Sequence, residues 1–341
     1  MKSRQKLELS YIPASVPCRE QELEQLRMLI EIRGKALLSG EIGTGKTLLA
    51  RYFSKDSVYI NCFINRSEHA ILESILSQIK PRFNPAGLPS RKLWSQIETN
   101  HLLILDEVEG ILMDDLTHFL YTLSRQSEQG KGVRYIGITR DANALRYMVN
   151  DDATWSTFAE KAVIHLRPYT HTQIMKILSY RTQEALYPDT IDDDSLSLIA
   201  DIAVESRGHM RAAIDILRNA AFLAEKQRQN TITPENIREA NLDVWASSIE
   251  SLSLSQLLSL LPVAVICRSK AYADIEEIKE VYTVRCENYE LKPDENVLME
   301  NLEDLEKEGF VHRRGGSYTI LCSPTSRLIG EIEKVLELQL H

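Results

Sequence analysis

One stretch of eight residues limits the fold more than any other part of this 341-residue chain. Residues 40–47 read GEIGTGKT, with the apolar run KALLS before them and the helical pattern LLARYF after them. Glycines let the backbone turn tightly enough to aim several N–H groups at one anion, and a helix that begins there adds its favourable dipole. The pattern predicts a phosphate-binding loop between a strand and a helix of an α/β domain.

The end of this loop supplies the polar groups that a nucleoside triphosphate requires. Lys46 is expected to neutralise the β- and γ-phosphates, and Thr47 to hold Mg²⁺ through its hydroxyl. A second motif supports this interpretation, because the apolar residues 102–105 show a buried-strand pattern that ends in Asp106 and Glu107. Asp106 is expected to bind Mg²⁺ through water, and Glu107 to polarise the attacking water as a general base. These motifs together predict an ATPase.

The hydrophobic patterns divide the chain into three predicted domains. Short apolar runs alternate with amphipathic segments in residues 1–168, which predicts an α/β domain with a mostly parallel sheet. Residues 169–245 show helical spacing of apolar residues and predict a small all-helical domain. Residues 246–341 begin with helices and end in two short strand patterns, GFVHRR and SYTILCS, joined by a pair of glycines. That ending predicts a β-hairpin.

Composition places further limits on the class of protein. The chain has no uninterrupted apolar stretch of the roughly 18 residues that a membrane span needs, and its N-terminus has no apolar block typical of a secretory signal. Five cysteines without a CxxC pair argue against a disulfide framework and against a zinc site. We therefore expect a cytoplasmic protein without a membrane partner.

Several short blocks along the chain follow a common order. They are PCREQEL at residues 17–23, INC at 60–62, YIGIT at 135–139 and GHMRAAIDILR at 208–218. These blocks resemble successive parts of the archaeal origin-recognition replication initiators, AAA+ ATPases related to the eukaryotic origin recognition complex and its cell-division-cycle partner. The segment from LSLSQLLSLLP to LEDLEKEGFV resembles the winged helix of the same family. The resemblance implies an AAA+ parallel-sheet domain, an all-helical lid and a C-terminal winged-helix domain.

The resemblance also implies roles for individual residues. Thr139 would meet the γ-phosphate or the attacking water as the first sensor, and Arg211 would reach the γ-phosphate from the lid as the second. The nucleotide-binding residues that the loop motif and the resemblance imply are Val16, Pro17, Arg19, Gly40, Gly43, Thr44, Gly45, Lys46, Thr47, Leu48, Tyr169, Ile177 and Arg211. The implied catalytic residues are Lys46, Glu107, Thr139 and Arg211, with Thr47 and Asp106 at the metal.

Two positions depart from the family pattern. The first-sensor position is normally followed by Asn, but here Arg140 follows Thr139, and an arginine cannot accept a hydrogen bond. Thr154 stands where the family carries the arginine finger that acts on the nucleotide of a neighbouring subunit. Arg140 or Arg146 could supply that charge instead. If neither arginine acts as a finger, we expect a long-lived nucleotide switch whose ATP turnover is slow and does not increase with self-association.

The predicted winged helix carries few positive charges where DNA would bind. The whole chain has a formal net charge of −9, and the second helix of the winged helix has an acidic outer face. That face carries Glu300, Glu303, Asp304 and Glu308 against Lys307. We therefore expect DNA contacts from the hairpin, because Arg can enter a minor groove or hold the backbone. The hairpin residues are Arg313, Arg314, Gly315, Gly316 and Ser317, and a second basic segment carries Lys80, Arg82, Arg91 and Lys92.

These features together favour an ATP-gated, DNA-binding protein of replication initiation that recognises origins or loads a helicase. The implied partners are duplex DNA and a replicative helicase or other initiator subunits at the nucleoid, with the chain a monomer or an ATP-dependent oligomer. Two alternatives stay open. The acidic charge favours a clamp-loader-like or signalling AAA+ ATPase whose winged helix binds protein, although the Ser-Arg-Cys block of clamp-loader subunits does not occur. A transcriptional regulator could use the same module.

Overall fold

The computed structural model describes residues 1–97, 100–128, 133–206, 209–241, 249–321 and 323–340. The chain divides into one compact unit of residues Ile12–Tyr169 and another of Met1–Tyr11 with Thr170–His341. The first eleven residues thus cluster with the second half of the chain, whereas the sequence patterns place them in a first domain of residues 1–168. The predicted boundary at 245 and Gly208 of the GHMRAAIDILR block lie outside the described residues. In the ranges described, no helix is long and apolar enough to cross a membrane.

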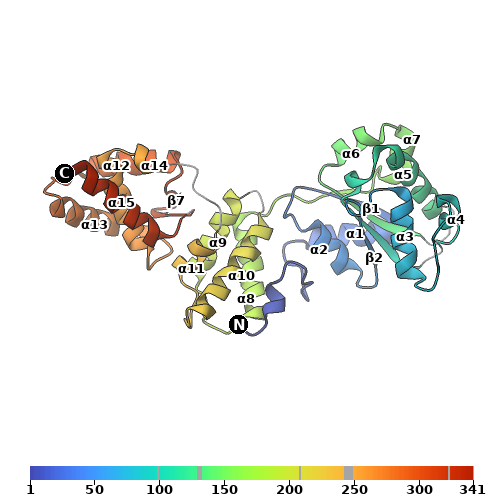
Figure 1. Ribbon diagram of the computed structural model, residues 1–341, viewed down its shortest axis with the longest axis horizontal. Coiled ribbons are helices and arrows are strands. Elements are labelled where there is room, and N and C mark those ends of the chain that lie inside the picture. The colour runs from blue at the N-terminus through green and yellow to red at the C-terminus, as the bar shows by residue number, and fades with distance from the viewer. Residues whose placement is uncertain (98–99, 129–132, 207–208, 242–248, 322, 341) are drawn as a thin grey trace. The chain divides into compact units, whose positions relative to one another are not determined.

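The unit of residues Ile12–Tyr169 is built on a five-stranded sheet with parallel pairings. The strand order is β2-β3-β4-β1-β5. Figure 1 labels β1 and β2 of this sheet. The strands are β1 (Lys35–Ser39), β2 (Val58–Asn61), β3 (Leu102–Asp106), β4 (Arg134–Thr139) and β5 (Val163–His165). The prediction of a parallel α/β sheet for this part of the chain is confirmed.

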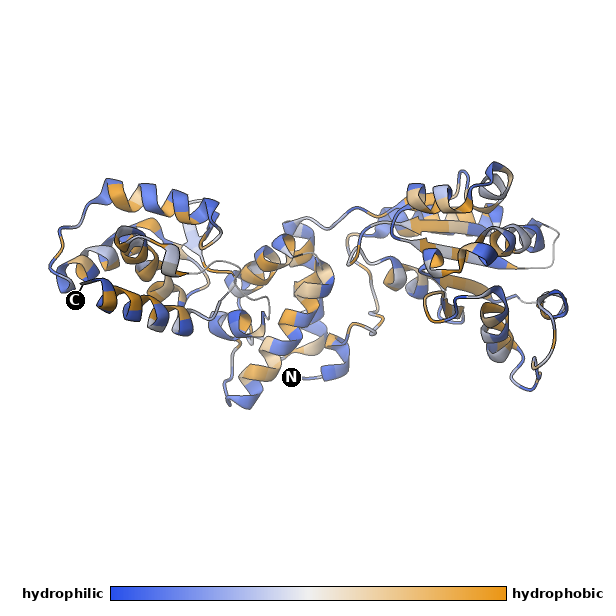
Figure 2. Ribbon diagram, turned by 45° about the horizontal axis from the view of Figure 1, so that its top comes forward, coloured by the Kyte–Doolittle hydropathy of each residue, from blue (hydrophilic) through white to orange (hydrophobic). Residues whose placement is uncertain are grey.

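Helices cover both faces of this sheet because its central strands are apolar on both sides. Leu37 of β1 belongs to one hydrophobic core, whereas its neighbours Ala36 and Leu38 belong to another on the opposite face. Figure 2 shows the strands of this sheet coloured as hydrophobic. The covering elements are α1 (Glu20–Arg33), α2 (Lys46–Phe53), α3 (Glu68–Ile79), α4 (Ser90–Trp94), the 3-10 helix η2 (Val108–Gly110), α5 (Met113–Glu128), α6 (Ala142–Val149) and α7 (Asp152–Phe158).

The parallel arrangement brings four strand ends to one edge of the sheet. Ser39 at the end of β1 lies opposite Thr139 at the end of β4. Asn61 at the end of β2 lies opposite Asp106 at the end of β3. The carboxyl ends of the strands are where open α/β sheets bind ligands, so this edge is the expected place for a site.

The other unit contains a helical part that confirms the all-helical prediction. Its elements are α8 (His171–Ala185), α9 (Asp193–Glu205), α10 (Met210–Lys226) and α11 (Pro234–Ala240), with the N-terminal 3-10 helix η1 (Arg4–Leu7) against α8 and α10. Arg181 of α8 donates to the backbone oxygen of Lys6 at 2.8 Å, and Leu7 is fully buried. These contacts explain why the first residues of the chain fold with its helical part.

The C-terminal part of the same unit has a hydrophobic core of its own. Its elements are η3 (Ile249–Ser251), α12 (Leu254–Cys267), β6 (Ala273–Asp274), α13 (Ile275–Asn288), α14 (Glu295–Lys307), β7 (His312–Arg314), β8 (Ser317–Thr319) and α15 (Thr325–Leu340). The strands form an antiparallel sheet in the order β6-β8-β7, and the predicted hairpin turns at Gly315 and Gly316. The helix, short strand, two helices and hairpin follow one another in the order that a winged helix requires.

A buried arginine connects the helical part to the C-terminal part. Arg238 of α11 is fully buried, and its guanidinium donates to the carbonyl oxygens of Ile320 at 2.8 Å, Cys267 at 2.6 Å and Ala271 at 2.9 Å. Burial lowers the pKa of Arg238. These hydrogen bonds are buried, and loss of the guanidinium would remove all three at once, so its loss would be costly at this junction.

Candidate nucleotide-binding site

The loop between β1 and α2 has the tight backbone that a phosphate site needs. Gly45 has a φ of +88° directly before α2, and a Cβ atom there would lie 2.8 Å from the hydroxyl oxygen of Tyr169. A Cβ atom at Gly40 would lie 2.4 Å from the backbone oxygen of Leu166. Both positions therefore require glycine, and the loop keeps its backbone open to an anion. Gly43 lies in the same loop.

Lys46 begins α2 and holds its ammonium group at this loop. Its Nζ atom donates to the backbone oxygens of Gly40 at 2.5 Å and Glu41 at 2.7 Å. Thr44, which is fully buried, donates its hydroxyl to the same Glu41 oxygen at 2.8 Å. The cation is therefore held at the loop, and its contact with a phosphate group stays a prediction. Leu48 follows in the first turn of α2 and is partly buried.

The two predicted metal residues are in direct contact. The hydroxyl of Thr47 donates to Oδ2 of Asp106 at 2.8 Å, and the hydroxyl of Tyr59 donates to the same oxygen at 2.8 Å. Asp106 is only 5% exposed. Burial, with the neighbouring Asp106 carboxylate, raises the pKa of Tyr59, so the phenol stays protonated and remains a donor. A hydroxyl beside a carboxylate supplies the oxygen ligands that Mg²⁺ prefers, so these residues fit the predicted metal.

Glu107 is held in an unusual backbone conformation beside Asp106. Its φ of +57° and ψ of +54° are left-handed, which costs a non-glycine residue about 1–3 kcal/mol and persists only where the surroundings impose it. Asn61 donates through Nδ2 to Oε2 of Glu107 at 2.9 Å. The Asn61 amide is oriented by the backbone N–H groups of Phe63 and Ile64, which donate to its Oδ1 atom. The Asn61 side chain therefore fixes one oxygen of the predicted general base.

Tyr59 and Asn61 are site residues that the sequence motifs did not assign. Both lie at the end of β2, and β2 pairs with β3 in the register that places Asn61 beside Asp106. Asn61 belongs to the INC block, so its position in that block was the available signal. Nothing local to Tyr59 indicates its contact, because Asp106 lies 47 residues away in the sequence.

Arg19 connects the N-terminal segment of this unit to the phosphate loop. It is 5% exposed, and its guanidinium lies over the ring of Tyr169 with 3.9 Å from the central carbon to the ring centroid. Its Nη2 atom donates to the backbone oxygens of Thr44 at 3.0 Å and Arg167 at 2.6 Å. Val16 is buried and Pro17 is partly buried before it. The structure thus gives Arg19 and Tyr169 a role in supporting the loop, and the predicted adenine contacts of this segment stay predictions.

Thr139 lies where a first sensor is expected. It is 1% exposed at the end of β4, opposite the last residue of β1, Ser39, after which the phosphate loop begins. Ser39 in turn accepts a hydrogen bond from the backbone N–H of Ala142 at 3.0 Å, so the segment after β4 is attached to the strand before the loop. These contacts place Thr139 beside the loop, and its contact with a phosphate or water stays a prediction.

Thr154 is unsuited to reach a neighbouring subunit. It is 1% exposed in the first turn of α7, and its backbone N–H donates to Oδ2 of Asp151 at 2.8 Å. Hydrogen bonds from Thr154, led by the one from its side chain, lower the pKa of Asp151. Thr154 therefore helps to begin this helix and offers no cation at the surface. Arg146 of α6 is exposed and pairs with Asp152 at 3.2 Å.

Ile177 and Arg211 belong to the other compact unit. Ile177 lies in α8 and is partly buried, whereas Arg211 lies in the first turn of α10 and is exposed. An exposed cation at this point is compatible with a sensor role. The approach of either side chain to the nucleotide stays a prediction.

The two arginines of the hairpin have different surroundings. Arg313 is exposed, with Nε donating to the backbone oxygen of Gly315 at 3.3 Å. Arg314 forms an ion pair with Asp201 of α9, and its Nη2 atom lies 2.8 Å from Nδ1 of His171. Asp201 is 4% exposed, so this ion pair is partly shielded from water. Arg314 is therefore less available to DNA than Arg313.

The remaining hairpin residues and the acidic helix also have defined surroundings. Ser317 donates its hydroxyl to Asp274, whereas Gly315 and Gly316 have open space around them. The predicted acidic face of α14 is exposed. Glu300, Glu303 and Asp304 lie on α14, and Glu308 directly follows its last residue. Of α14 and the hairpin, the hairpin tip is therefore the part that an anionic partner could approach.

The second basic segment that the sequence offers for DNA contact has three exposed residues and one partly buried residue. Lys80 donates to the backbone oxygen of Gln96 at 2.7 Å and is partly buried. Arg82, Arg91 and Lys92 are exposed. Contact of this segment with DNA stays a prediction.

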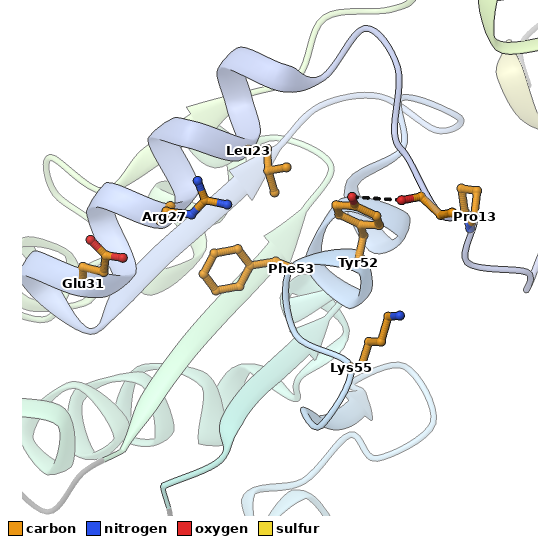
Figure 3. A pocket seen from close by; sticks show the side chains of 8 residues that line it. Pro13, Leu23, Arg27, Glu31, Tyr52, Phe53 and Lys55 are labelled. Atoms are coloured by element: carbon orange, nitrogen blue, oxygen red, sulfur yellow. Dashed lines mark hydrogen bonds between the residues drawn. The ribbon is translucent and has the colours of Figure 1, made fainter. Parts of the chain in front are cut away.

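A surface pocket of about 420 Å³ lies elsewhere on the unit of residues Ile12–Tyr169 (Figure 3). Leu23 and Arg27 of α1 line it together with Tyr52 and Phe53 at the end of α2. The hydroxyl of Tyr52 donates to the backbone oxygen of Ala14 at 3.2 Å and attaches the N-terminal segment to α2. No residue that the sequence assigns to the nucleotide lines this pocket.

Comparisons with known proteins agree with this geometry. The family model described as "ATPase family associated with various cellular activities (AAA)" matches residues 36–153, and the one described as "Cdc6 AAA+ ATPase-type lid domain" matches residues 175–242. An ORC1-type DNA replication protein of Pyrococcus horikoshii is 26% identical over 329 residues, which cover 86% of this chain and 78% of that protein.

Solved structures of Cdc6 and ORC1 proteins are also similar to this chain. A Cdc6p structure from Pyrobaculum aerophilum has a TM-score of 0.86 at 26% identity and covers 99% of both chains. The structure of the Aeropyrum pernix ORC1 protein in complex with DNA has a TM-score of 0.60 at 24% identity, covering 99% of this chain and 96% of that one, and shows a shared fold.

The parallel sheet, the glycine-rich loop, the strand that ends in Asp106 and Glu107 and the helical lid define an ATPase of the AAA+ class. Within that class, the chain matches the Cdc6-type lid model and is similar over most of its length to an ORC1-type DNA replication protein and to a Cdc6p structure. The family resemblance that the sequence blocks indicated is confirmed.

Proposed function

We propose that this AAA+ ATPase is an ATP-gated switch that binds duplex DNA in replication initiation. The observation that carries the proposal is the contact of Thr47 with Asp106 at 2.8 Å, which brings the two residues proposed to hold Mg²⁺ together beside the glycine-rich loop. The C-terminal part of the same chain carries a hairpin with the exposed Arg313. The names of the similar proteins, a DNA replication protein and an ORC1 protein in complex with DNA, support the process and the ligand.

The residues at the edge of the sheet divide the work of the nucleotide site. Thr47 and Asp106 would hold Mg²⁺, which would supply positive charge to the bound phosphates. Lys46 would neutralise the phosphates from the loop. Glu107 would accept a proton from the attacking water, with Asn61 holding its other oxygen in place.

Hydrolysis by a single chain should be slow, which suits a switch. An arginine finger typically contributes a factor on the order of 10³ to 10⁵ in rate, and the buried Thr154 supplies no such charge. ATP would then remain bound long enough to define a state. Arg211 of the lid would sense the γ-phosphate, because a cation on a separate unit contacts ATP and ADP differently.

DNA contact by the C-terminal part would centre on Arg313 at the hairpin. An exposed arginine without a carboxylate partner among the described residues can enter a minor groove or hold a phosphate, and Arg314 is already ion-paired with Asp201, whereas the acidic face of α14 would be repelled by DNA. A helicase or other initiator subunits would be further partners at the nucleoid, in the cytoplasm.

A titration of labelled duplex DNA with the full chain tests this function. Fluorescence anisotropy without nucleotide, with ADP and with ATP and Mg²⁺ should give affinities that differ between nucleotide states. Lys46→Ala should remove that difference and leave the nucleotide-free affinity unchanged. Absence of DNA binding at low salt in every nucleotide state would refute the DNA function. Equal DNA affinities in every nucleotide state would refute control of DNA binding by ATP.

The acidic face of α14 favours a second function, an ATPase whose C-terminal part binds protein. In that case the chain would fail to bind DNA in the titration above. Nucleotide-dependent association with a purified initiator subunit or helicase would then identify the partner class.

A further inference from the structure

Arg140 lies among acidic residues at the edge of the sheet, directly after β4. Its backbone N–H donates to Oε1 of Glu109 at 3.1 Å, and its Nε atom lies 3.8 Å from the same oxygen. Its Nη2 atom lies 3.7 Å from Oε1 of Glu107. Its central guanidinium carbon is 5.9 Å from the ring centroid of Phe63. Residues that follow β2 and β3 thus contact one side chain that follows β4.

Both carboxylate oxygens of Glu107 consequently have a partner. Oε2 accepts the hydrogen bond from Asn61 at 2.9 Å, and Oε1 faces the Arg140 guanidinium at 3.7 Å. A carboxylate that activates water needs an oxygen that is free to accept a hydrogen bond from that water. The hydrogen bond from Asn61 leaves Oε1 of Glu107 available to the water. The Arg140 guanidinium competes with the water for that oxygen.

We infer that Arg140 is a positioning residue that restrains the Glu107 carboxylate and so limits ATP hydrolysis. The inference rests on the proposed role of Glu107 as the general base. Glu109 anchors the restraint, because its carboxylate holds both the backbone and the side chain of Arg140. The left-handed backbone of Glu107 gives its side chain a fixed starting direction, so a modest attraction is enough to select one orientation.

The same contacts bear on the missing arginine finger. A finger needs a cation that is free to reach a neighbouring nucleotide, and the charge of Arg140 is already compensated by two carboxylates of its own chain. Arg140 therefore acts within the site of its own chain. Its restraint on Glu107 slows hydrolysis in addition to the absence of an arginine finger from a neighbouring chain.

The expected effect is small because the ion pair is exposed. The side chains of Arg140 and Glu107 are 56% and 34% exposed. Exposed pairs of this kind are weak, so removal of the guanidinium is expected to raise kcat about three- to fivefold. KM should not change, because the restraint acts on the base and not on the bound phosphates.

Steady-state ATP hydrolysis by the full chain tests the inference, with kcat and KM measured for Arg140→Ala and Arg140→Lys. Arg140→Lys keeps the charge and should hydrolyse ATP close to the wild-type rate. Arg125→Ala is the matched control, since Arg125 is also an exposed arginine that pairs with a glutamate, Glu128 at 3.0 Å, and lies over an aromatic ring, Tyr121 at 5.2 Å. It should leave both constants unchanged.

Each result decides one point. A raised kcat at constant KM for Arg140→Ala supports the restraint. An unchanged or lower kcat, or a raised KM, overturns it, and a raised KM would place Arg140 on the phosphates instead. Glu107→Gln separates the inference from the function on which it rests. If Glu107→Gln hydrolyses ATP at the wild-type rate, Glu107 is not the base. If Glu107→Gln is inactive while Arg140→Ala is unchanged, only the restraint fails.

Discussion

Replacement of Lys46 by alanine tests the nucleotide site most directly. The Lys46 ammonium group donates to the backbone oxygens of Gly40 at 2.5 Å and Glu41 at 2.7 Å. A phosphate oxygen carries a negative charge where a backbone carbonyl carries only a dipole. Nucleotide binding therefore gives Lys46 a stronger acceptor than the loop itself provides, and the alanine variant loses that gain.

The size of the loss follows from the exchange of partners. A hydrogen bond to a charged group contributes about 1.5–3 kcal/mol. The bonds of Lys46 to the loop exist before the nucleotide arrives, so we assign the gain to one new charged hydrogen bond. Its removal corresponds to roughly a 10- to 150-fold increase in the Kd for ATP.

Isothermal titration calorimetry with ATP and Mg²⁺ measures this Kd. Lys55→Ala is the matched control, because Lys55 is an exposed lysine just beyond the far end of α2 and lies outside the phosphate loop. It should bind ATP as the wild type does. A Kd for Lys46→Ala within a factor of about two of the wild-type value would refute the assignment of the phosphate loop.

Turnover per chain should stay constant as the protein concentration rises, because the buried Thr154 supplies no charge to a neighbour; a steep rise that Arg146→Ala abolishes would show that a finger exists. Arg313→Ala should lower the salt dependence of DNA binding by about one in logarithmic slope, and Arg314→Ala by less, because a lid carboxylate already pairs with Arg314; equal reductions would contradict this difference. Burial lowers the pKa of His171, so the unfolded chain takes up the proton first as the pH falls below about 6.5. Thermal unfolding should show a loss of stability on acidification that is smaller in His171→Gln, and an identical pH profile for that variant would exclude this cause.

The meeting of the two nucleotide motifs was predictable because it depends on residues that are close together in sequence or are brought together by a simple rule. Residues 40–47 form a local loop, and Asp106 and Glu107 end a strand of the same sheet. Parallel strands end at one edge, so two motifs separated by about 60 residues had to meet there. The contact of Thr47 with Asp106 confirms that reasoning.

The C-terminal hairpin was predictable for a similar reason. Two short strand patterns separated by Gly315 and Gly316 need only a local turn to pair, and β7 and β8 pair as expected. The acidic face of α14 follows from helical spacing alone, because the buried residues Leu298, Leu302 and Leu305 determine which face is left to solvent.

The partners of the charged side chains were decided only by the tertiary structure. Arg314 has the sequence context of a free wing arginine, yet it pairs with Asp201, 113 residues away. Arg238 has the context of a surface helix residue, yet it is fully buried against backbone oxygens of the C-terminal part. The sequence shows that Arg140 departs from the family pattern. It does not show that Glu107 and Glu109 lie within reach of the Arg140 side chain. A long flexible cation can pair with any acceptor that packing brings within a few ångströms, and its own neighbours in sequence do not specify which acceptor that is.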